Sequence, residues 1–320
     1  MDKKPAIPPL PGLFFGLLAV STASVFIRYA QQEAPSLVIA ASRLTIASLV
    51  LAPIVLKWRR AELRRLSAGD LRLALLSGFF LALHFATWIS SLEYTTVASS
   101  VVLVTTTPLW VALLAPLTLK ESISRLVLIG MALALAGGVV VGMSDACLLQ
   151  AGRLVCPSAA EFFQGQAFLG DLLALAGALM AACYIIIGRR LRARVSLLSY
   201  IFVVYGMAAV VLVVIMLGAG QTPLGYSGMT YIWFILLALV PQLLGHSSFN
   251  WALGYLSAAY VSIALLGEPI GSTILAYIFL DEAPTAIKIF GAILILSGIY
   301  IASRSEASPR NGEAMESAET

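Results

Sequence analysis

The sequence predicts an all-α membrane protein with ten transmembrane helices, arranged as two inverted five-helix repeats. Three observations support this fold class: the composition, the length of the apolar stretches and an internal duplication. Of the 320 residues, 60% are hydrophobic and 11% are charged, which is more apolar surface than a soluble domain of this length can bury. The apolar stretches run for roughly 20 residues, the length that a helix needs to cross a hydrocarbon core of ~30 Å.

The duplication is visible directly in the chain. Residues 92–138 reappear at 253–299 without a gap, shifted by 161 positions. The matches least expected by chance are Tyr94/Tyr255, Pro108/Pro269, Glu121/Glu282, Gly130/Gly291 and Gly137/Gly298. The same offset pairs Gly16 with Gly177 and Arg28 with Arg189. A duplication inside a multi-span membrane protein is typical of transporters whose substrate site lies between the repeats.

Ten apolar stretches follow one another along the chain, and we expect each to form one helix. They are residues 10–30, 36–56, 73–92, 97–119, 124–143, 167–188, 196–218, 229–250, 257–280 and 285–303. Lys3 and Lys4 precede the first stretch, as in a signal peptide. The stretch reaches spanning length and no small-residue cleavage site follows it, so we expect a membrane helix there.

The chain divides into five parts on this basis. We expect a cytoplasmic N-terminus (1–9), a first repeat (10–143), an outer loop (144–166), a second repeat (167–303) and a disordered cytoplasmic tail (304–320). With the N-terminus in the cytoplasm, the cytoplasmic segments hold 16 of the 20 Lys and Arg residues, as the positive-inside rule requires. Five helices per repeat is an odd number, so the second repeat enters the membrane from the opposite side. This pattern fits a multi-pass protein of the bacterial inner (plasma) membrane.

The repeated residues resemble those of a known family. Each copy has an aromatic residue on one helix (Trp88, Phe249), a Leu-x-Tyr turn, an Ala- and Ser-rich helix that reaches a Pro, a terminal Glu and a Gly-x6-Gly helix. This arrangement resembles the EamA repeat of the drug/metabolite transporter superfamily over nearly the whole chain. The resemblance implies ten helices and a central cavity lined by helices 1, 3, 4, 6, 8 and 9. It also implies a role in the export of amino acids or other small metabolites.

Glu268 lies near the middle of the ninth stretch. A carboxylate at the centre of a membrane helix costs ~2.5–3.5 kcal/mol on insertion scales, so a function is the default interpretation. Glu268 could couple transport to protons or bind a substrate ammonium group. The structural alternative is a protonated carboxyl that donates to a backbone carbonyl freed by Pro269, which lacks an N–H and breaks the helix.

Two polar stripes are predicted on other helices. Gln242, His246 and Asn250 are spaced four residues apart, so on an α-helix they share one face, which should line the bundle interior or a cavity. His246 is a candidate proton partner of Glu268, and interhelical hydrogen bonding is the alternative. The other stripe is formed by His84, Trp88 and Ser91. Trp88 could stack on a substrate or anchor the helix at the membrane interface.

Several further residues are predicted to have structural roles. Pro108 should break the fourth helix, and the hydroxyls of the threonines before it commonly satisfy the freed carbonyls, although one of them, Thr106, could face the cavity. Arg28 and Arg43 can snorkel to the outer interface. Cys147 and Cys156 fall in the outer loop, where a disulfide could form in an oxidising compartment.

The resulting hypothesis is a secondary-active or facilitative transporter of small organic metabolites that works by alternating access. Its partners are a small-molecule substrate, the lipid bilayer and, as a candidate coupling ion, the proton; nucleic acid is not expected. No P-loop, H-E-x-x-H or C-x-x-C motif occurs, so we expect no ATPase, no metal site and no cofactor. The alternative is a membrane-embedded enzyme that uses Glu268 and His246 as acid and base on a lipid-linked substrate. We expect a transporter and not an enzyme.

Overall fold

The computed structural model describes residues 9–119, 125–146, 148–150, 153–155, 165–256 and 258–307. Within these ranges the regular secondary structure is helical except for one short hairpin, β1 (Leu148–Gln150) and β2 (Arg153–Val155), whose strands pair antiparallel. The hairpin lies in the predicted outer loop, and the fold is all-α as predicted. Cys147, Cys156 and Glu121 lie outside the described residues, and so does the chain after Ala307.

Seven helices are long and apolar enough to cross a membrane in the part of the chain that the structure describes. They are Pro11–Ala30, Ser36–Trp58, Ala68–Tyr94, Val97–Leu114, Gln166–Arg192, Leu197–Gly218 and Gly228–Ala252. Three shorter apolar helices, Leu128–Val141, Leu265–Leu280 and Ala286–Ile301, fall at the remaining predicted stretches. The protein is therefore a multi-pass membrane protein.

Each predicted stretch contains one helix or a helix with a break. The elements are α1 (Pro9–Ser21), α2 (Ala23–Ala30), α3 (Ser36–Trp58), α4 (Arg60–Arg64), α5 (Ala68–Tyr94), α6 (Val97–Val104), α7 (Thr107–Leu119), α8 (Arg125–Ala146), α10 (Gln166–Arg192), α11 (Leu197–Gly218), α12 (Gly228–Leu237), α13 (Ser247–Ala252), α14 (Ala258–Ala264), α15 (Glu268–Leu280) and α16 (Ala286–Ala307). A π-helix (Ala238–His246) joins α12 to α13, and a 3-10 helix (Leu265–Gly267) joins α14 to α15. The last helix, α16, continues past residue 303, where the tail was predicted to begin.

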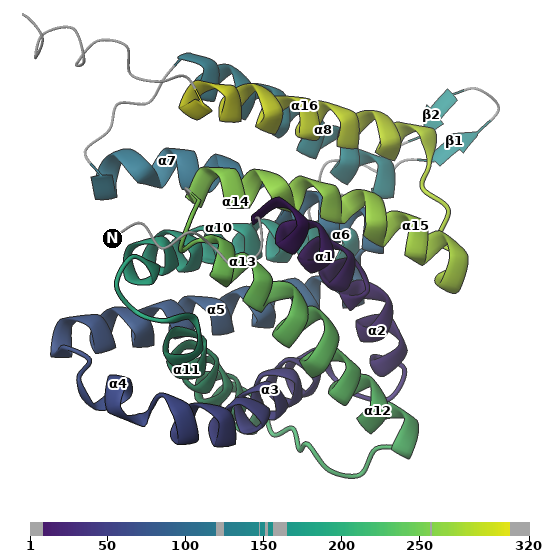
Figure 1. The fold of residues 1–320 in the computed structure, drawn as a ribbon. Helices are drawn as coiled ribbons and strands as arrows, with labels where there is room; N and C mark the ends of the chain where they lie inside the picture. Colours follow the sequence, from purple (N-terminus) through teal and green to yellow (C-terminus); the bar gives the residue numbers. More distant parts are fainter. Residues whose placement is uncertain are drawn as a thin grey trace, which may run out of the picture.

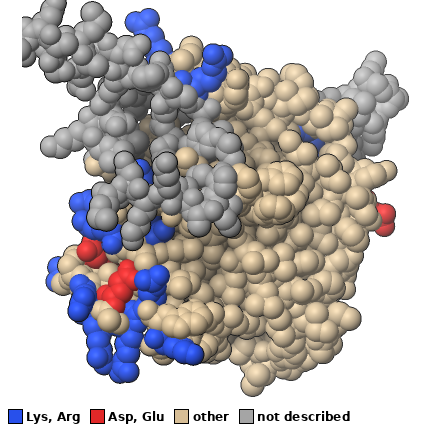
Figure 2. Space-filling model, viewed as in Figure 1, with Lys and Arg blue, Asp and Glu red and all other residues tan. Residues whose placement is uncertain are grey.

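The long helices pack side by side, and most of them run across the view in Figure 1. The hairpin is at the right of this view, and α4 is at the left. Figure 2 shows Lys and Arg side chains gathered at the left end, around α4 and the neighbouring helix ends. The described basic residues in these segments are Lys57, Arg59, Arg60, Arg64, Arg65, Arg72, Arg189, Arg190, Arg192 and Arg194. One end of the helix bundle is therefore strongly basic.

Helix starts at both ends of the bundle are capped by carboxylates from other elements. The Ser36 N–H donates to Glu93 Oε1 (2.9 Å), and the Ser196 N–H donates to Glu62 Oε1 (2.8 Å). The backbone N–H groups of Ser227 and Val97 donate to Glu33 and Glu282 in the same way. Because the first N–H groups of a helix have no partner within the helix, each carboxylate ties two elements together.

The closest helix contacts repeat at the offset of the duplication. A Cβ atom built on Gly137 would lie 2.6 Å from the carbonyl oxygen of Gly291, and one on Gly298 would meet the carbonyl oxygen of Gly130. Shifting both residues of the first contact to their counterparts produces the second contact. Glycine is required at these positions because α8 and α16 approach too closely for any side chain.

Two other contacts follow the same relationship. Arg28 donates to the carbonyl of Leu92, and Arg189 donates to the carbonyl of Leu253. Gly16 packs against Gly245 and Phe249, and its counterpart Gly177 packs against His84 and Trp88. Corresponding residues of the two halves therefore make corresponding contacts, from the first helix of each half to the last.

Candidate functional site

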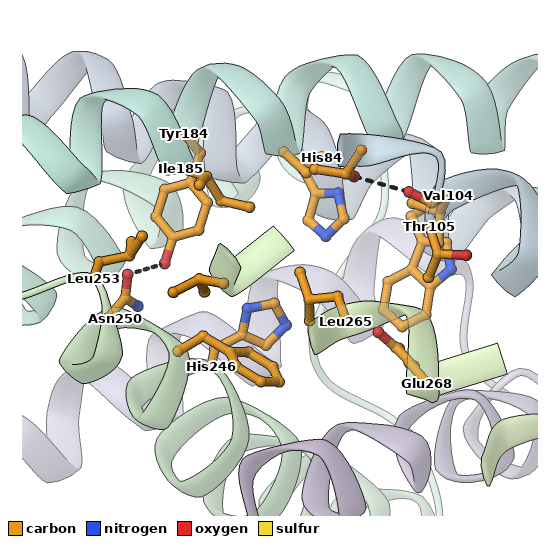
Figure 3. Close-up of a pocket in the computed structure, with 15 residues that line it drawn as sticks. His84, Val104, Thr105, Tyr184, Ile185, His246, Asn250, Leu253, Leu265 and Glu268 are labelled. Carbon is orange, nitrogen blue, oxygen red and sulfur yellow. Dashed lines mark hydrogen bonds between the residues drawn. The ribbon is translucent and has the colours of Figure 1, made fainter. Parts of the chain in front are cut away.

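A pocket lies between the two halves of the chain (Figure 3), with about 620 Å³ of empty space including its mouth. The first half contributes residues from α5, α6 and α7, and the second half contributes residues from α10 and from the broken helices that contain the π-helix and the 3-10 helix. The lining consists of His84, Trp88, Val104, Thr105, Thr107, Ala181, Tyr184, Ile185, His246, Phe249, Asn250, Leu253, Val261, Leu265 and Glu268. The helix breaks place these side chains at the centre of the bundle.

The break between α6 and α7 comes directly before Pro108. Proline has no N–H to donate to the carbonyl four residues earlier, which belongs to Val104. The Thr107 hydroxyl donates to this carbonyl (2.9 Å) and lies within 3.3 Å of the Ala178 carbonyl on α10. The predicted structural role of the threonines is therefore confirmed for Thr107. Thr105 and Thr107 line the pocket, whereas Thr106 does not, and its hydroxyl donates to the Leu103 carbonyl (2.8 Å).

The second break precedes α15, and Glu268 and Pro269 are the first residues of that helix. The Leu265 carbonyl, which Pro269 cannot engage, accepts the backbone N–H of Glu268. The Glu268 side chain is 9% exposed and lines the pocket. Its carboxyl group has no hydrogen-bond partner among the described residues, so the structure does not contain the bond to a freed carbonyl that the structural alternative requires.

The eighth span departs from the predicted α-helix. Residues Ala238–His246 form a π-helix that contains Pro241. Its wider i→i+5 turns mean that residues four apart no longer share one face. Gln242 therefore does not line the pocket; its Oε1 accepts the Nε–H of Arg43 (2.9 Å). The prediction of one cavity stripe is wrong for Gln242, whereas His246 and Asn250 both line the pocket.

Asn250 is held by two tyrosines. The Tyr184 hydroxyl donates to Asn250 Oδ1 (2.6 Å), and Asn250 Nδ2 donates to the Tyr205 hydroxyl (3.2 Å). Figure 3 shows the Tyr184–Asn250 pair at one end of the pocket and Glu268 at the other. Tyr184 was not predicted as a site residue, because a tyrosine in an apolar helix has no pattern that separates it from the core.

His84 and His246 lie between these two ends (Figure 3), with ring centroids 6.3 Å apart. His84 Nδ1 lies 3.0 Å from the Gly177 carbonyl oxygen, and the His84 ring stacks on Trp88 at 5.9 Å. No described residue forms a hydrogen bond with the His246 ring. The two imidazoles therefore differ, because His84 is anchored to α10 and His246 is free to contact a ligand.

The other two members of the third-helix stripe are buried. Trp88 is 3% exposed and lines the pocket, so an anchor at the lipid interface is wrong for this residue. Ser91 does not line the pocket. Its hydroxyl pairs with Ser100 (2.6 Å) and donates to the Trp88 carbonyl (2.7 Å). Ser91 therefore joins α5 to α6.

Two arginines have different environments. Arg28 forms an ion pair with Glu282, in agreement with its predicted structural role. Arg43 is 0% exposed and lies in the core, so the prediction that it snorkels to the interface is wrong. Its partners, Gln242 and the face of Phe85 (4.2 Å to the ring centroid), come from distant parts of the chain. The signal that could have identified it is an arginine placed inside a spanning segment.

In the described ranges, no three His, Cys, Asp or Glu side chains form a group that could hold a metal ion. Cys183 on α10 is a free thiol. The chemistry that the site offers is thus one carboxyl group, two imidazoles, an amide, three hydroxyl groups and aromatic faces. Such a set can bind a small molecule by hydrogen bonds, charge and stacking.

Comparison with known proteins is consistent with this geometry. Residues 10–143 and 168–304 match the EamA-like transporter family. An "Uncharacterized transporter" of Archaeoglobus fulgidus is 22% identical over 283 residues, which cover 88% of this chain and 92% of that protein. A solved crystal structure has the same fold, with a TM-score of 0.64 at 19% identity over 94% of this chain and 99% of the other. This multi-pass membrane protein belongs to the EamA-like transporter family.

Proposed function

We propose that the protein moves a small organic metabolite across the membrane by alternating access around the pocket between its two halves. The observation that carries this proposal is Glu268, a buried carboxyl without a hydrogen-bond partner among the described residues, which faces a pocket inside the membrane spans. An ionisable group in that position is by default functional. A ligand or a proton can satisfy it, and both are the cargo of secondary transporters.

Ten spans in two inverted five-helix repeats are part of the proposal. The matched contacts Gly137–Gly291 and Gly298–Gly130 support a twofold relationship between the repeats. The three shorter apolar helices would complete the ten spans, since a helix broken at a proline can still cross the membrane as two halves. The basic end of the bundle supports a cytoplasmic location for α4 and both termini, in a bacterial inner membrane.

The conformational cycle follows from the position of the pocket. Residues of both repeats line it, so a rocking motion of one repeat against the other would open it to one side and then to the other. The breaks before Pro108 and Pro269 supply points at which the half-helices can tilt. The ion pair between Arg28 and Glu282 joins the two halves and would hold the end opposite the basic face closed.

The lining supports amino acids or related compounds as substrates. Trp88, Phe249 and Tyr184 offer aromatic surfaces for an apolar body. Glu268 can bind an ammonium group, and Asn250 and His246 can orient polar substituents. Export, not uptake, is the direction that the family resemblance favours.

A membrane-embedded enzyme is the rival function. Acid–base chemistry on a lipid-linked substrate needs a second acid or a metal beside Glu268. The described residues of the pocket lining include no other carboxyl group, so the geometry favours binding over catalysis. Among the described lining residues, such an enzyme could use Glu268 with one of the two imidazoles, His246 or His84.

Untargeted mass spectrometry of the growth medium tests the proposal. Cells expressing the wild type should accumulate at least one metabolite outside that cells expressing Glu268→Gln at equal membrane level do not. Accumulation with both proteins would keep an exporter but remove Glu268 from its mechanism. An unchanged medium with both proteins, correctly inserted, would overturn export.

A further inference from the structure

Arg43 is a buried charge that forms no ion pair with an acidic side chain among the described residues. Its side chain is fully buried on α3, and its guanidinium carbon lies 4.2 Å from the centroid of the Phe85 ring. One nitrogen, Nε, donates to Gln242. The other two, Nη1 and Nη2, are buried and have no hydrogen-bond partner among the described residues. Since a guanidinium keeps its proton, the core contains a permanent positive charge.

This charge lies one aromatic ring behind the pocket. The Phe85 ring that Arg43 covers has its centroid 4.8 Å from the His84 ring and 5.1 Å from the His246 ring, and both imidazoles line the pocket. The titratable groups that interact electrostatically with Arg43 are His84 on α5, Tyr205 on α11, His246 on the π-helix and Glu268 on α15. Glu268 is the acid among them, and it forms no ion pair with Arg43.

The duplication sets this group apart from the scaffold. The contacts that close the bundle recur in both repeats, whereas the offset of 161 places Val204 opposite Arg43, Leu81 opposite Gln242 and Thr107 opposite Glu268. The group of Arg43, Gln242 and Glu268 therefore has no counterpart in the other repeat. Packing alone does not need it, because the equivalent positions in the other repeat are occupied by apolar or neutral residues.

We propose that Arg43 is the fixed countercharge of the pocket and that one negative charge at a time balances it. In the empty pocket this charge is the Glu268 carboxylate, and in the loaded pocket it is the carboxylate of the substrate. Binding of a substrate whose carboxylate is its only charge then places a proton on Glu268. This inference rests on the proposed function, since it uses the same pocket, and it defines substrate class and coupling together.

The physical reason is the cost of unbalanced charge in a medium of low polarity. A buried positive charge is stabilised by one negative charge nearby, and a second negative charge in the same small volume is repelled. The proton comes from water and goes to a Glu268 oxygen, and no other bond changes. Arg43 acts across the Phe85 ring, so it is a positioning residue for the substrate.

Calorimetry on the full-length protein in nanodiscs tests this inference. Four probes share a phenyl group and differ in charge: 3-phenylpropanoate, L-phenylalanine, phenethylamine and 3-phenylpropanamide. Titrations in buffers of different ionisation enthalpy give the number of protons taken up on binding. In the wild type near neutral pH, 3-phenylpropanoate should bind with uptake of about one proton. L-phenylalanine, whose ammonium group offsets its carboxylate, and the neutral amide should bind with none.

Substitutions at Arg43 and at Glu268 separate the roles of the two residues. Arg43→Gln should weaken carboxylate binding about tenfold or more, whereas Arg43→Lys, which keeps the charge, should retain most of the binding. Should Arg43→Gln not fold, Glu268→Gln still decides, because carboxylate binding should persist in it with proton uptake reduced to zero.

The outcomes distinguish this inference from the proposed function. Binding of 3-phenylpropanoate without proton uptake in the wild type, or with equal uptake in Glu268→Gln, would overturn the countercharge proposal. Binding of phenethylamine alone would overturn it as well and leave the transport pocket intact. Binding of none of the four probes to folded protein would count against both proposals.

Discussion

Arg28 and Glu282 form an ion pair between the two halves of the chain, with Nη2 of the arginine 3.0 Å from Oε1 of the glutamate. The same guanidinium donates to the carbonyls of Leu92 and Thr95, and Glu282 also accepts the Val97 N–H. Four elements, α2, α5, α6 and the segment after α15, therefore meet at this pair. In the proposed transport cycle, a motion that separates these elements would break the pair.

Glu282→Gln should shift the protein toward a state open at this end. Both side chains are about one-quarter exposed (25% and 24%), so we expect the pair to contribute ~0.5–1 kcal/mol, which corresponds to a change of about two- to fivefold in the opening equilibrium. The measurement is the rate at which an impermeant thiol reagent added from that side labels a single cysteine in the pocket.

Asp281→Asn is the matched control for this prediction. Asp281 is adjacent and exposed, and its φ of 55° lies in the left-handed region, which asparagine also tolerates. Its labelling rate should equal that of the wild type. If the cysteine is labelled no faster in Glu282→Gln than in Asp281→Asn, the ion pair does not hold this end closed.

Gly137→Ala should destabilise the contact between α8 and α16, the last helices of the two repeats. The added Cβ would lie 2.6 Å from the Gly291 carbonyl oxygen and 2.8 Å from the Ile295 nitrogen. These are backbone atoms, so α8 and α16 must separate, and we expect a loss of ~1–3 kcal/mol. The free energy of unfolding in detergent, or the midpoint of thermal unfolding, measures it.

Gly138→Ala is the control on the same helix. A Cβ there meets only Leu103, at 3.6 Å, which is ordinary contact. Because alanine favours helix over glycine, this variant should be as stable as the wild type or more stable. Equal destabilisation by both variants would argue against the close contact.

Glu62 should make the stability of the basic end depend on pH. Burial raises the pKa of Glu62, but the hydrogen bonds from Ser196 and Ser199 and the charge of Arg59 outweigh burial and hold the pKa below its usual value of 4.5. A depressed pKa in the folded protein means that the carboxylate stabilises it above pH 4.5. This contribution is lost as the pH falls through the lower, folded-state pKa.

Thermal unfolding of the wild type and Glu62→Gln across pH 3–7 measures this effect. The difference in midpoint should be largest near neutral pH and should shrink toward the acidic end. In a Ser196→Ala background, which removes the hydroxyl that donates to Glu62 Oε2 (2.6 Å), the difference should be smaller at every pH. A difference that grows on acidification would contradict the assignment.

The two histidines should respond differently to substitution. The duplication places Phe85 opposite His246, so His246→Phe keeps a ring that the fold accommodates in the other repeat. We expect unfolding within ~0.5 kcal/mol of the wild type, in the range of a tolerated substitution, together with reduced metabolite accumulation in the medium. His84→Phe removes the bond to the Gly177 carbonyl and should cost ~1 kcal/mol. Wild-type accumulation with His246→Phe would exclude a role for this imidazole in the site.

Much of the scaffold is predictable from the sequence because it is repeated. The offset of 161 alone identifies the glycine pairs, the two prolines and the Arg28/Arg189 pair as equivalent. It does not reveal that Gly137 meets Gly291 and not Gly298. That choice depends on the antiparallel packing of α8 and α16, which the sequence of either helix does not encode.

The site is less predictable because its geometry depends on local irregularity. Gln242 was expected on the pocket face, but the π-helix turns it toward Arg43, and hydrogen bonds of the i→i+5 kind leave no mark in an apolar sequence. Arg43 was expected at the interface because it lies only about two turns from a helix end. Its burial depends on Gln242 and Phe85, which are distant in the chain.

The most direct test of the account is the accessibility of Ala181→Cys from both sides of the membrane, in a background in which Cys147, Cys156 and Cys183 are replaced by serine. Ala181 lines the pocket and is small enough to exchange for cysteine. Alternating access predicts that an impermeant thiol reagent labels this cysteine in both right-side-out and inside-out vesicles. A transported substrate should lower labelling from both sides. Labelling from one side only, with and without substrate, would contradict a pocket that opens alternately to each side.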